Sequence, residues 1–246
     1  MRCVVVMRGL VGGIVVGTLA CAGSVFAANE AETAELLVKF MQTSRQVITE
    51  YQDVINDSSK GNKGFTGDFA GEKFVAKFKE KADIDLNKPT NLSSQQQKLL
   101  LVLLESGKEV VADAQTIINK QGISFKGFIP AVWGRKTGEK FGQRTGIKLK
   151  LTAVDYRFPG NKPDDFESEV LRLFSDPSYP KGKEYSRMTM VNGKPILRMM
   201  APEYASAKCL KCHGEPRGER DITGNKKEGI KEGGLTGAIS LMIPVQ

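Results

Sequence analysis

Five residues near the C-terminal end of the chain combine two thiols with an imidazole: Cys209-Leu210-Lys211-Cys212-His213. This C-x-x-C-H spacing is typical of covalent haem attachment. Two cysteines three positions apart fit one helical turn, where their thiols form thioether bonds with the vinyl groups of one porphyrin. The adjacent histidine then ligates the iron. We predict Cys209 and Cys212 as the anchors of one covalent haem c, and His213 as its proximal iron ligand.

Three other chemistries of this motif compete with haem. A structural zinc site needs four ligands, usually from a second Cys/His pair, and His213 is the only histidine in the chain. A thioredoxin-like dithiol is expected at the start of a helix in a βαβ unit and leaves the histidine unexplained. A structural disulfide is the simplest alternative. The export signal described next favours haem, because haem c is attached after a chain crosses the membrane.

The N-terminal 27 residues have the pattern of a secretory signal peptide. Arg2 and Arg8 come first, an apolar run extends over residues 9–20, and Val25-Phe26-Ala27 forms a small-residue cleavage site. The run is too short for a comfortable membrane span. We predict cleavage after Ala27 and a periplasmic or otherwise exported protein without a stable membrane span. Lipoprotein processing at Cys21 and retention as an uncleaved anchor are the alternatives.

The charge pattern restricts the kinds of partner. The chain carries a formal charge of +8, and cleavage would remove Arg2 and Arg8 to leave +6. Basic and acidic residues are interspersed, and no basic stripe alternates with aromatic residues, so we expect no nucleic-acid partner. A mild positive charge suits a solvated surface and also steers acidic proteins. We expect a redox partner protein; the charge is compatible with an acidic partner or an anionic membrane surface, and a solvated surface alone also explains it.

The other side of the iron cannot be assigned from the motif. A single histidine excludes bis-histidine ligation within one chain, and signal cleavage would remove Cys3 and Cys21. Methionine, lysine, water or an open position remain, and the choice separates electron transfer from ligand sensing. Met41 is the distal candidate, since it lies on the apolar face of the first helix. The weaker candidates are Met188, Met190, Met199, Met200 and Lys126.

Two arginines are candidates for binding the haem propionates, which need cationic or hydrogen-bonding partners where they are buried. Arg157 lies in a turn-rich loop that contains two prolines, and Arg198 lies on the expected strand before the motif. Salt bridging at the surface is the alternative role for both.

The first half of the mature chain has helical periodicity. Apolar residues recur at helical spacing from Leu36 to Ile55, and again in a helix expected to begin near Ser94 with Gln97 closing a capping box. An offset of 63 residues relates the two stretches. It superimposes polar residues as well: Gln52 on Gln115, Asn56 on Asn119, and Lys63-Gly64-Phe65 on Lys126-Gly127-Phe128. We predict a duplicated helix-plus-turn unit, packed as an antiparallel pair.

The second half alternates between strand and helix patterns. Strands are expected over residues 146–154, 184–191, 194–200 and 235–243, with Asn192-Gly193 as a hairpin turn. Asp164 is expected to cap a helix whose apolar face includes Phe166 and Phe174. Residues 214–234 are polar and glycine-rich and are expected to form a mobile loop. These elements predict an α+β fold around an antiparallel sheet.

From about residue 125 to 245 the chain resembles a family of PAS-like single-haem c-type domains, found as exported cytochromes and as sensor modules. The segments that carry the resemblance are Phe128-Ile129-Pro130-Ala131, Arg157 to Glu167, Leu197-Arg198 with Pro202, Cys209 to Gly214, and Gly237-Ala238-Ile239-Ser240.

The resemblance implies a PAS-like antiparallel sheet with the haem against it. Some members of the family use a distal cysteine from an upstream helix, and others use methionine or water. This chain has no cysteine there, and it has Phe158 where an asparagine commonly follows the arginine. The distal chemistry of the family is therefore not transferred to this chain.

Together these patterns predict a signal peptide at 1–27, a helical region at 28–124 and a PAS-like haem c domain at 125–246, the last two forming one compact unit. The predicted function is an exported monohaem c-type cytochrome that transfers single electrons. A haem-based redox or gas sensor acting through a separate partner is the alternative. A haem peroxidase would need a distal acid–base group, usually a second histidine, so we do not expect an enzyme.

Overall fold

Apolar residues at helical spacing give way to alternating apolar residues after Gly146, and the fold changes at the same place. The computed structural model describes residues 22–245. Within that range the helices are α1 (Ala22–Glu50), α2 (Gln52–Asn56), α3 (Gly67–Ala82), α4 (Ser94–Asp113), α5 (Gln115–Ile118), α6 (Pro130–Thr145), α7 (Asp165–Ser175) and α8 (Leu210–His213). The strands are β1 (Lys148–Thr152), β2 (Tyr185–Val191), β3 (Lys194–Tyr204) and β4 (Leu235–Pro244).

The predicted α+β class is confirmed. The strands form one antiparallel sheet in the order β1-β4-β3-β2, and each expected strand is present. Asn192 and Gly193 form the predicted β2–β3 turn, with φ angles of 50° and 75°. Asp164 caps α7 in a reciprocal capping box with Glu167. The box at α4 is one residue earlier than expected, since Ser93 and Gln96 make it.

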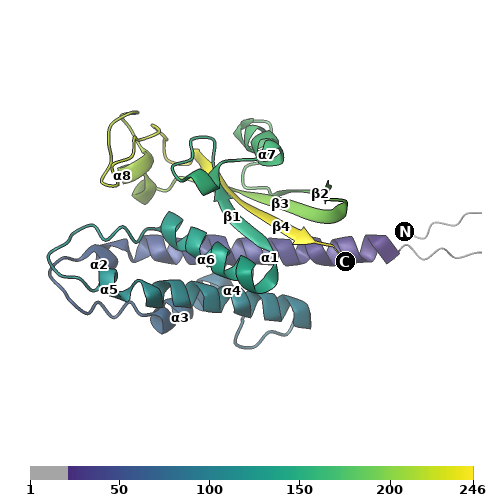
Figure 1. Ribbon diagram of the computed structural model, residues 1–246, viewed down its shortest axis with the longest axis horizontal. Coiled ribbons are helices and arrows are strands. Elements are labelled where there is room, and N and C mark those ends of the chain that lie inside the picture. Colours follow the sequence, from purple (N-terminus) through teal and green to yellow (C-terminus); the bar gives the residue numbers. More distant parts are fainter. Residues whose placement is uncertain (1–21, 246) are drawn as a thin grey trace, which may run out of the picture.

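The sheet is covered on both faces (Figure 1). One face packs on the helical layer, and a continuous hydrophobic core joins Leu197 and Met199 of β3 and Leu241 of β4 to side chains of α1, α3, α4 and α6. On the other face α7 covers a smaller cluster around Met200 and Phe166. The helical region and the sheet therefore share one core.

The helical repeat is present, and its polar residues hold the two copies together. The Asn56 side chain accepts a hydrogen bond from the Lys126 backbone N–H at 3.0 Å, and Asn119 accepts one from Lys63 at 3.1 Å. Gln52 donates to the Phe128 carbonyl at 3.0 Å, and Gln115 donates to the Phe65 carbonyl at 2.9 Å. Each copy thus binds the turn of the other, which explains why residues beyond the apolar positions match in register.

The repeat is longer than predicted and its orientation is different. The same offset of 63 residues carries α3 onto α6, so each copy includes a second helix after the turn. The expected antiparallel packing of the two long helices is wrong. The reciprocal bonds bring the C-terminal ends of α1–α2 and α4–α5 to the same end of the molecule, and α1 and α4 run in the same direction (Figure 1). The returning helices α3 and α6 supply the antiparallel contacts.

Residues 1–21 of the predicted signal peptide lie outside the described residues. The rest of it, up to Ala27, belongs to the helix α1. None of the helices in residues 22–245 is long and apolar enough to cross a membrane.

The reciprocal hydrogen bonds predict matched effects on stability. Asn56→Ala and Asn119→Ala should each lower the free energy of unfolding by about 1–2 kcal/mol, because each leaves a backbone N–H without its acceptor. Urea unfolding measures both, with Asn87→Ala as control, since Asn87 is exposed and its side chain makes no hydrogen bond among the described residues. Variants as stable as the Asn87 control would contradict the exchange of turns.

Candidate functional site

The C-x-x-C-H motif occupies one short helical segment. A 3-10 turn over Ala207–Cys209 leads into α8, which ends at His213. Cys209 and Cys212 are free thiols and half-buried. Gly214 ends the segment, and a Cβ at this position would lie 2.5 Å from the Leu210 carbonyl oxygen. The chain therefore leaves α8 at once, with both thiols and the imidazole presented from a single turn.

The two thiols differ in their surroundings. The Cys209 Sγ lies 3.3 Å from the Ser206 hydroxyl oxygen. Burial and the nearby negative charge of Asp221 raise the pKa of the Cys212 thiol above its ordinary value. A thiol with a raised pKa is a poor thiolate nucleophile at neutral pH.

The His213 ring is held by a carboxylate. Its Nδ1 lies 2.8 Å from Oε2 of Glu228, whose side chain is 10% exposed. The backbone also joins these segments, since the Ile230 N–H donates to the His213 carbonyl at 2.8 Å. With Nδ1 engaged, Nε2 is the ring nitrogen left to act as a ligand.

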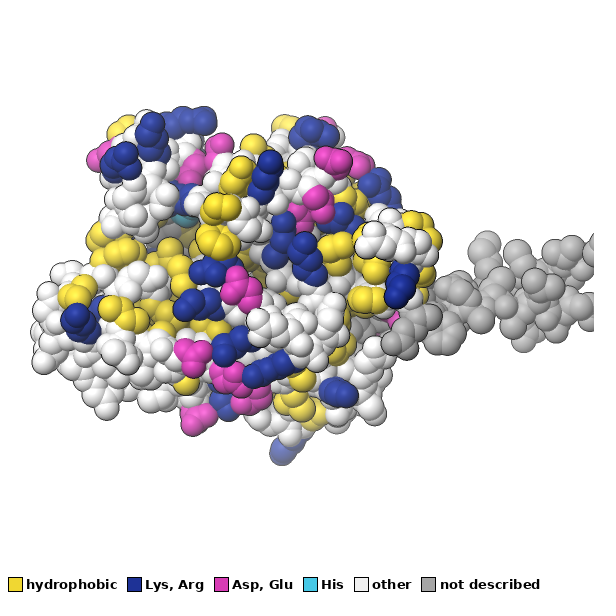
Figure 2. Space-filling view, viewed as in Figure 1, with side chains coloured by type: hydrophobic (Ala, Val, Ile, Leu, Met, Phe, Trp, Pro, Cys, Tyr) yellow, Lys and Arg dark blue, Asp and Glu magenta, His cyan; other side chains and the backbone are white. Residues whose placement is uncertain are grey.

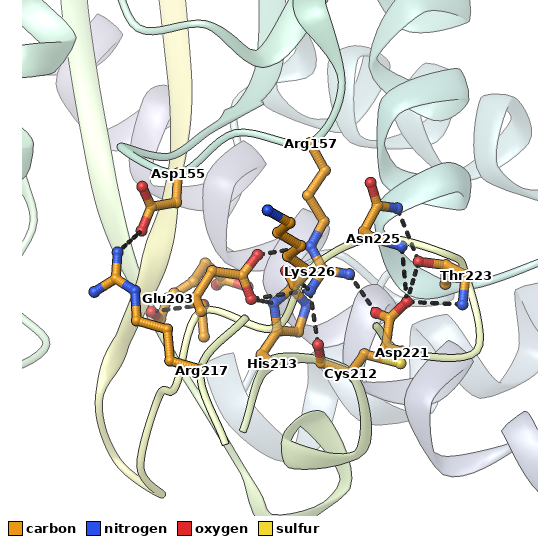
Figure 3. A network of polar contacts seen from close by, with 12 residues as sticks. Asp155, Arg157, Glu203, Cys212, His213, Arg217, Asp221, Thr223, Asn225 and Lys226 are labelled. Atoms are coloured by element: carbon orange, nitrogen blue, oxygen red, sulfur yellow. Dashed lines mark hydrogen bonds and ion pairs between the residues drawn. The ribbon is translucent and has the colours of Figure 1, made fainter. Parts of the chain in front are cut away.

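Arg157 binds the same carboxylate, and Figure 3 shows its side chain reaching Asp221 and the Cys212 carbonyl beside His213. It donates from Nε to Glu228 Oε1 at 2.6 Å, and from its terminal nitrogens to Glu228 Oε2 at 2.9 Å and Asp221 at 2.6 Å. A further bond of 2.7 Å reaches the Cys212 carbonyl. The guanidinium thus joins the loop after β1 to both ends of residues 212–228.

Asp221 and Glu228 are the two carboxylates of this network, and their hydrogen bonds favour the ionised form although both are largely buried. Burial raises the pKa of Asp221 and of Glu228, but hydrogen bonds to each outweigh it and hold both below their usual range. Thr223 and Arg157 supply the bonds to Asp221, and Arg157 and His213 those to Glu228. The network of one arginine and two carboxylates carries a net charge of −1.

Sequence reasoning missed Glu228 and Asp221. The sequence predicts a mobile loop over residues 214–234, but the Asp221 carboxylate accepts bonds from the Thr223 and Asn225 backbone N–H groups and closes a tight turn. Arg157 then fastens that turn. The one available signal was chemical, since a histidine that ligates a metal usually donates its other N–H to a carboxylate or carbonyl.

Arg198 lies away from the motif, against α7. It is 6% exposed, lies 2.7 Å from the Asp164 carboxylate and stacks 4.2 Å from the centre of the Phe166 ring. The contacts of Arg198 are with residues at the start of α7, whereas those of Arg157 are with the motif and the loop that follows it. The propionate role of both arginines stays a prediction.

The distal candidates have structural contacts of their own. Met41 is 1% exposed and belongs to the core shared by helices and sheet. The Lys126 ammonium donates to the Lys120 and Ile123 carbonyls of its own turn, and burial lowers its pKa. Met199 and Met200 are buried on opposite faces of the sheet, and Met188 and Met190 are exposed on β2. The distal ligand remains a prediction.

Exposed apolar side chains flank the arginine in the loop after β1. Val154, Tyr156 and Phe158 are 66%, 41% and 42% exposed. Figure 2 shows a hollow between the part of the molecule that carries α8 and the helical layer, with the histidine at its wall and hydrophobic side chains along its floor. Residues 22–245 contain no group of three or more His, Cys, Asp or Glu side chains arranged to hold a metal ion.

The Arg198 contacts predict a small pH-dependent contribution to stability. Burial raises the pKa of Asp164, but the bonds from Glu167 and Arg198 outweigh it and lower the pKa overall. The stabilisation is therefore present above the ordinary carboxyl pKa and is lost as the pH falls through the lowered value.

Asp164→Asn keeps the helix cap and removes the charge, so it should cost less than about 1 kcal/mol at neutral pH. Urea unfolding at neutral and acidic pH should show wild type and variant converging on acidification. A constant difference would contradict an ionic origin.

Comparison with known proteins gives one match. The chain matches the Tll0287-like family, described as Tll0287, over residues 26–244. No curated protein and no solved structure matches it. Because the match includes both the helical repeat and the sheet, the protein belongs to the Tll0287-like family, a family of cytochrome c-like and sensor domains.

Proposed function

We propose that this protein is an exported monohaem c-type cytochrome that transfers single electrons. The observation that carries the proposal is the pairing of two free thiols and the chain's only histidine on one turn, with His213 Nδ1 bound to Glu228. Membership of a cytochrome-like family agrees with it.

The side chains fit haem c. Attachment requires two thiols three positions apart and one imidazole nitrogen with a free lone pair, and Cys209, Cys212 and Nε2 of His213 supply these. The iron would supply one-electron chemistry. The protein's part is to anchor the group, to orient the imidazole and to cover the porphyrin with apolar side chains.

We further propose that the sheet with α7 is a PAS-like haem domain of residues 125–246, preceded by the helical region 28–124. The antiparallel order β1-β4-β3-β2 supports this assignment. The shared core supports a single compact unit, and α6 belongs to the repeat by its offset although it lies within 125–246.

Export and partner choice belong to the same proposal. Cleavage after Ala27 would remove the first six residues of α1 and both leader cysteines. The segment around the motif exposes basic side chains that favour an acidic redox partner. These are Lys208, Lys211, Arg217, Arg220, Lys226 and Lys231. Weak, small interfaces are typical of such transient encounters.

One observation favours a second candidate, a haem-based redox or gas sensor. Met41 is packed in the core and Lys126 is bound within its own turn. If neither moves and none of the other methionines reaches the iron, the distal position is open or holds water, which suits ligand binding. The chain has no second histidine, the usual distal acid–base group, and an enzymatic reaction is not part of either proposal.

Visible spectra of the protein matured with haem test both candidates. A haem c signal in alkaline pyridine is expected, and it should disappear in the Cys209→Ser, Cys212→Ser double variant. His213→Ala should keep covalent haem but change its spin state. No haem c signal in the wild type would overturn the proposal.

Carbon monoxide separates the two candidates. A low-spin ferrous spectrum unmoved by carbon monoxide supports the electron carrier, because the distal position is then filled. A high-spin spectrum with a rapid shift supports the sensor and contradicts the simple carrier.

A further inference from the structure

Hydrogen bonds link three side chains in series, from His213 to Glu228 to Arg157. The ring Nδ1 meets Glu228 Oε2 at 2.8 Å, and Arg157 holds the same carboxylate through both oxygens at 2.6 and 2.9 Å. The guanidinium also bonds Asp221 and the Cys212 and Lys226 carbonyls, so it is fixed by four partners. Glu228 therefore has little freedom to rotate away from the imidazole.

The charged side chains around His213 are largely buried, which strengthens the electrostatic interactions between them. The side chains of Arg157, Glu228 and Asp221 are 20%, 10% and 0% exposed. Hydrogen bonds between charged groups strengthen as water is excluded. With one positive and two negative groups, the network places a net charge of −1 beside a single imidazole ring.

We propose that Glu228, held by Arg157, is a positioning residue that fixes the His213 tautomer and strengthens the imidazole as an iron ligand. This inference rests on the proposed haem function. An acceptor on Nδ1 keeps the proton there, leaves the Nε2 lone pair free and raises ligand basicity. A nearby negative charge also favours the oxidised iron. Arg157 then acts on the iron ligand through the carboxylate.

A purely structural clamp is the competing explanation. The bond from the Ile230 N–H to the His213 carbonyl already joins the two segments. Arg157 would also hold the loop in place whichever tautomer the imidazole adopts. The test must therefore measure a property of the imidazole ring, such as its tautomer. The chain suits this, because His213 is its only histidine and gives a single imidazole signal.

The first experiment needs no haem. In the full-length Cys209→Ser, Cys212→Ser protein, ¹⁵N-histidine NMR in alkaline buffer should show one tautomer with the proton on Nδ1. Adding Glu228→Gln or Arg157→Gln should give mixed tautomers. The matched control is Glu219→Gln, a carboxylate of the same loop that pairs with Lys227 at 2.8 Å. Mixed tautomers already in the thiol-free parent would overturn the proposal.

The second experiment uses the haem-loaded protein. Glu228→Gln keeps the size of the side chain and removes its charge, so the equilibrium for reduction should rise about tenfold, which is about 59 mV for one electron. The iron–histidine stretching vibration of any five-coordinate ferrous form should shift to lower frequency, because the bond is weaker. Glu219→Gln should leave the potential unchanged, and melting curves check that each variant is folded.

The outcomes separate the two proposals. Haem c present with a potential that Glu228→Gln does not move contradicts the positioning role but leaves the cytochrome assignment standing. No haem c in the wild type contradicts the proposed function, whereas the tautomer result in the thiol-free protein stands or fails by itself.

Discussion

The partly buried contact between His213 and Glu228 is the constraint around which residues 206–230 are arranged. A carboxylate in this position needs other partners to remain ionised, and Arg157 supplies them from a distant loop. Asp221 in turn balances Arg157 and closes its own turn. Each group is stabilised by the next, so a polar, glycine-rich stretch adopts one conformation without a hydrophobic core of its own.

The rest of the fold supplies a rigid base for this network. Arg157 follows β1, and β1 pairs with β4 and packs on α6. Gly138 permits that packing, because a Cβ there would meet the Leu149 carbonyl oxygen at 2.2 Å. The two helical copies hold α6 in place by binding each other's turns. The duplicated helices therefore act on the site indirectly, by fixing the strand from which Arg157 extends.

Periodicity and local chemistry predicted the parts of the fold that depend on neighbouring residues. The four strands, the Asn192-Gly193 turn and the Asp164 cap follow from alternation and hydrogen-bonding side chains a few positions apart. The match of Gln and Asn across the repeat predicted the duplication, but not that the bonds run between copies. Helix direction depends on contacts between distant segments, which one sequence does not encode in its local pattern. The partner of Arg157 lies 71 positions away for the same reason. The sequence therefore predicted the two thiols and the imidazole as site residues. The Glu228 carboxylate beside the imidazole could be identified only from the structure.

Attachment of one haem to the Cys209–Cys212 turn is the central claim, and the mass of the intact, matured protein tests it most directly. The account predicts a mass increased by one haem, located by peptide mapping on the fragment that contains both cysteines and His213. An unmodified mass, or a fragment whose two thiols are joined only to each other, would contradict it.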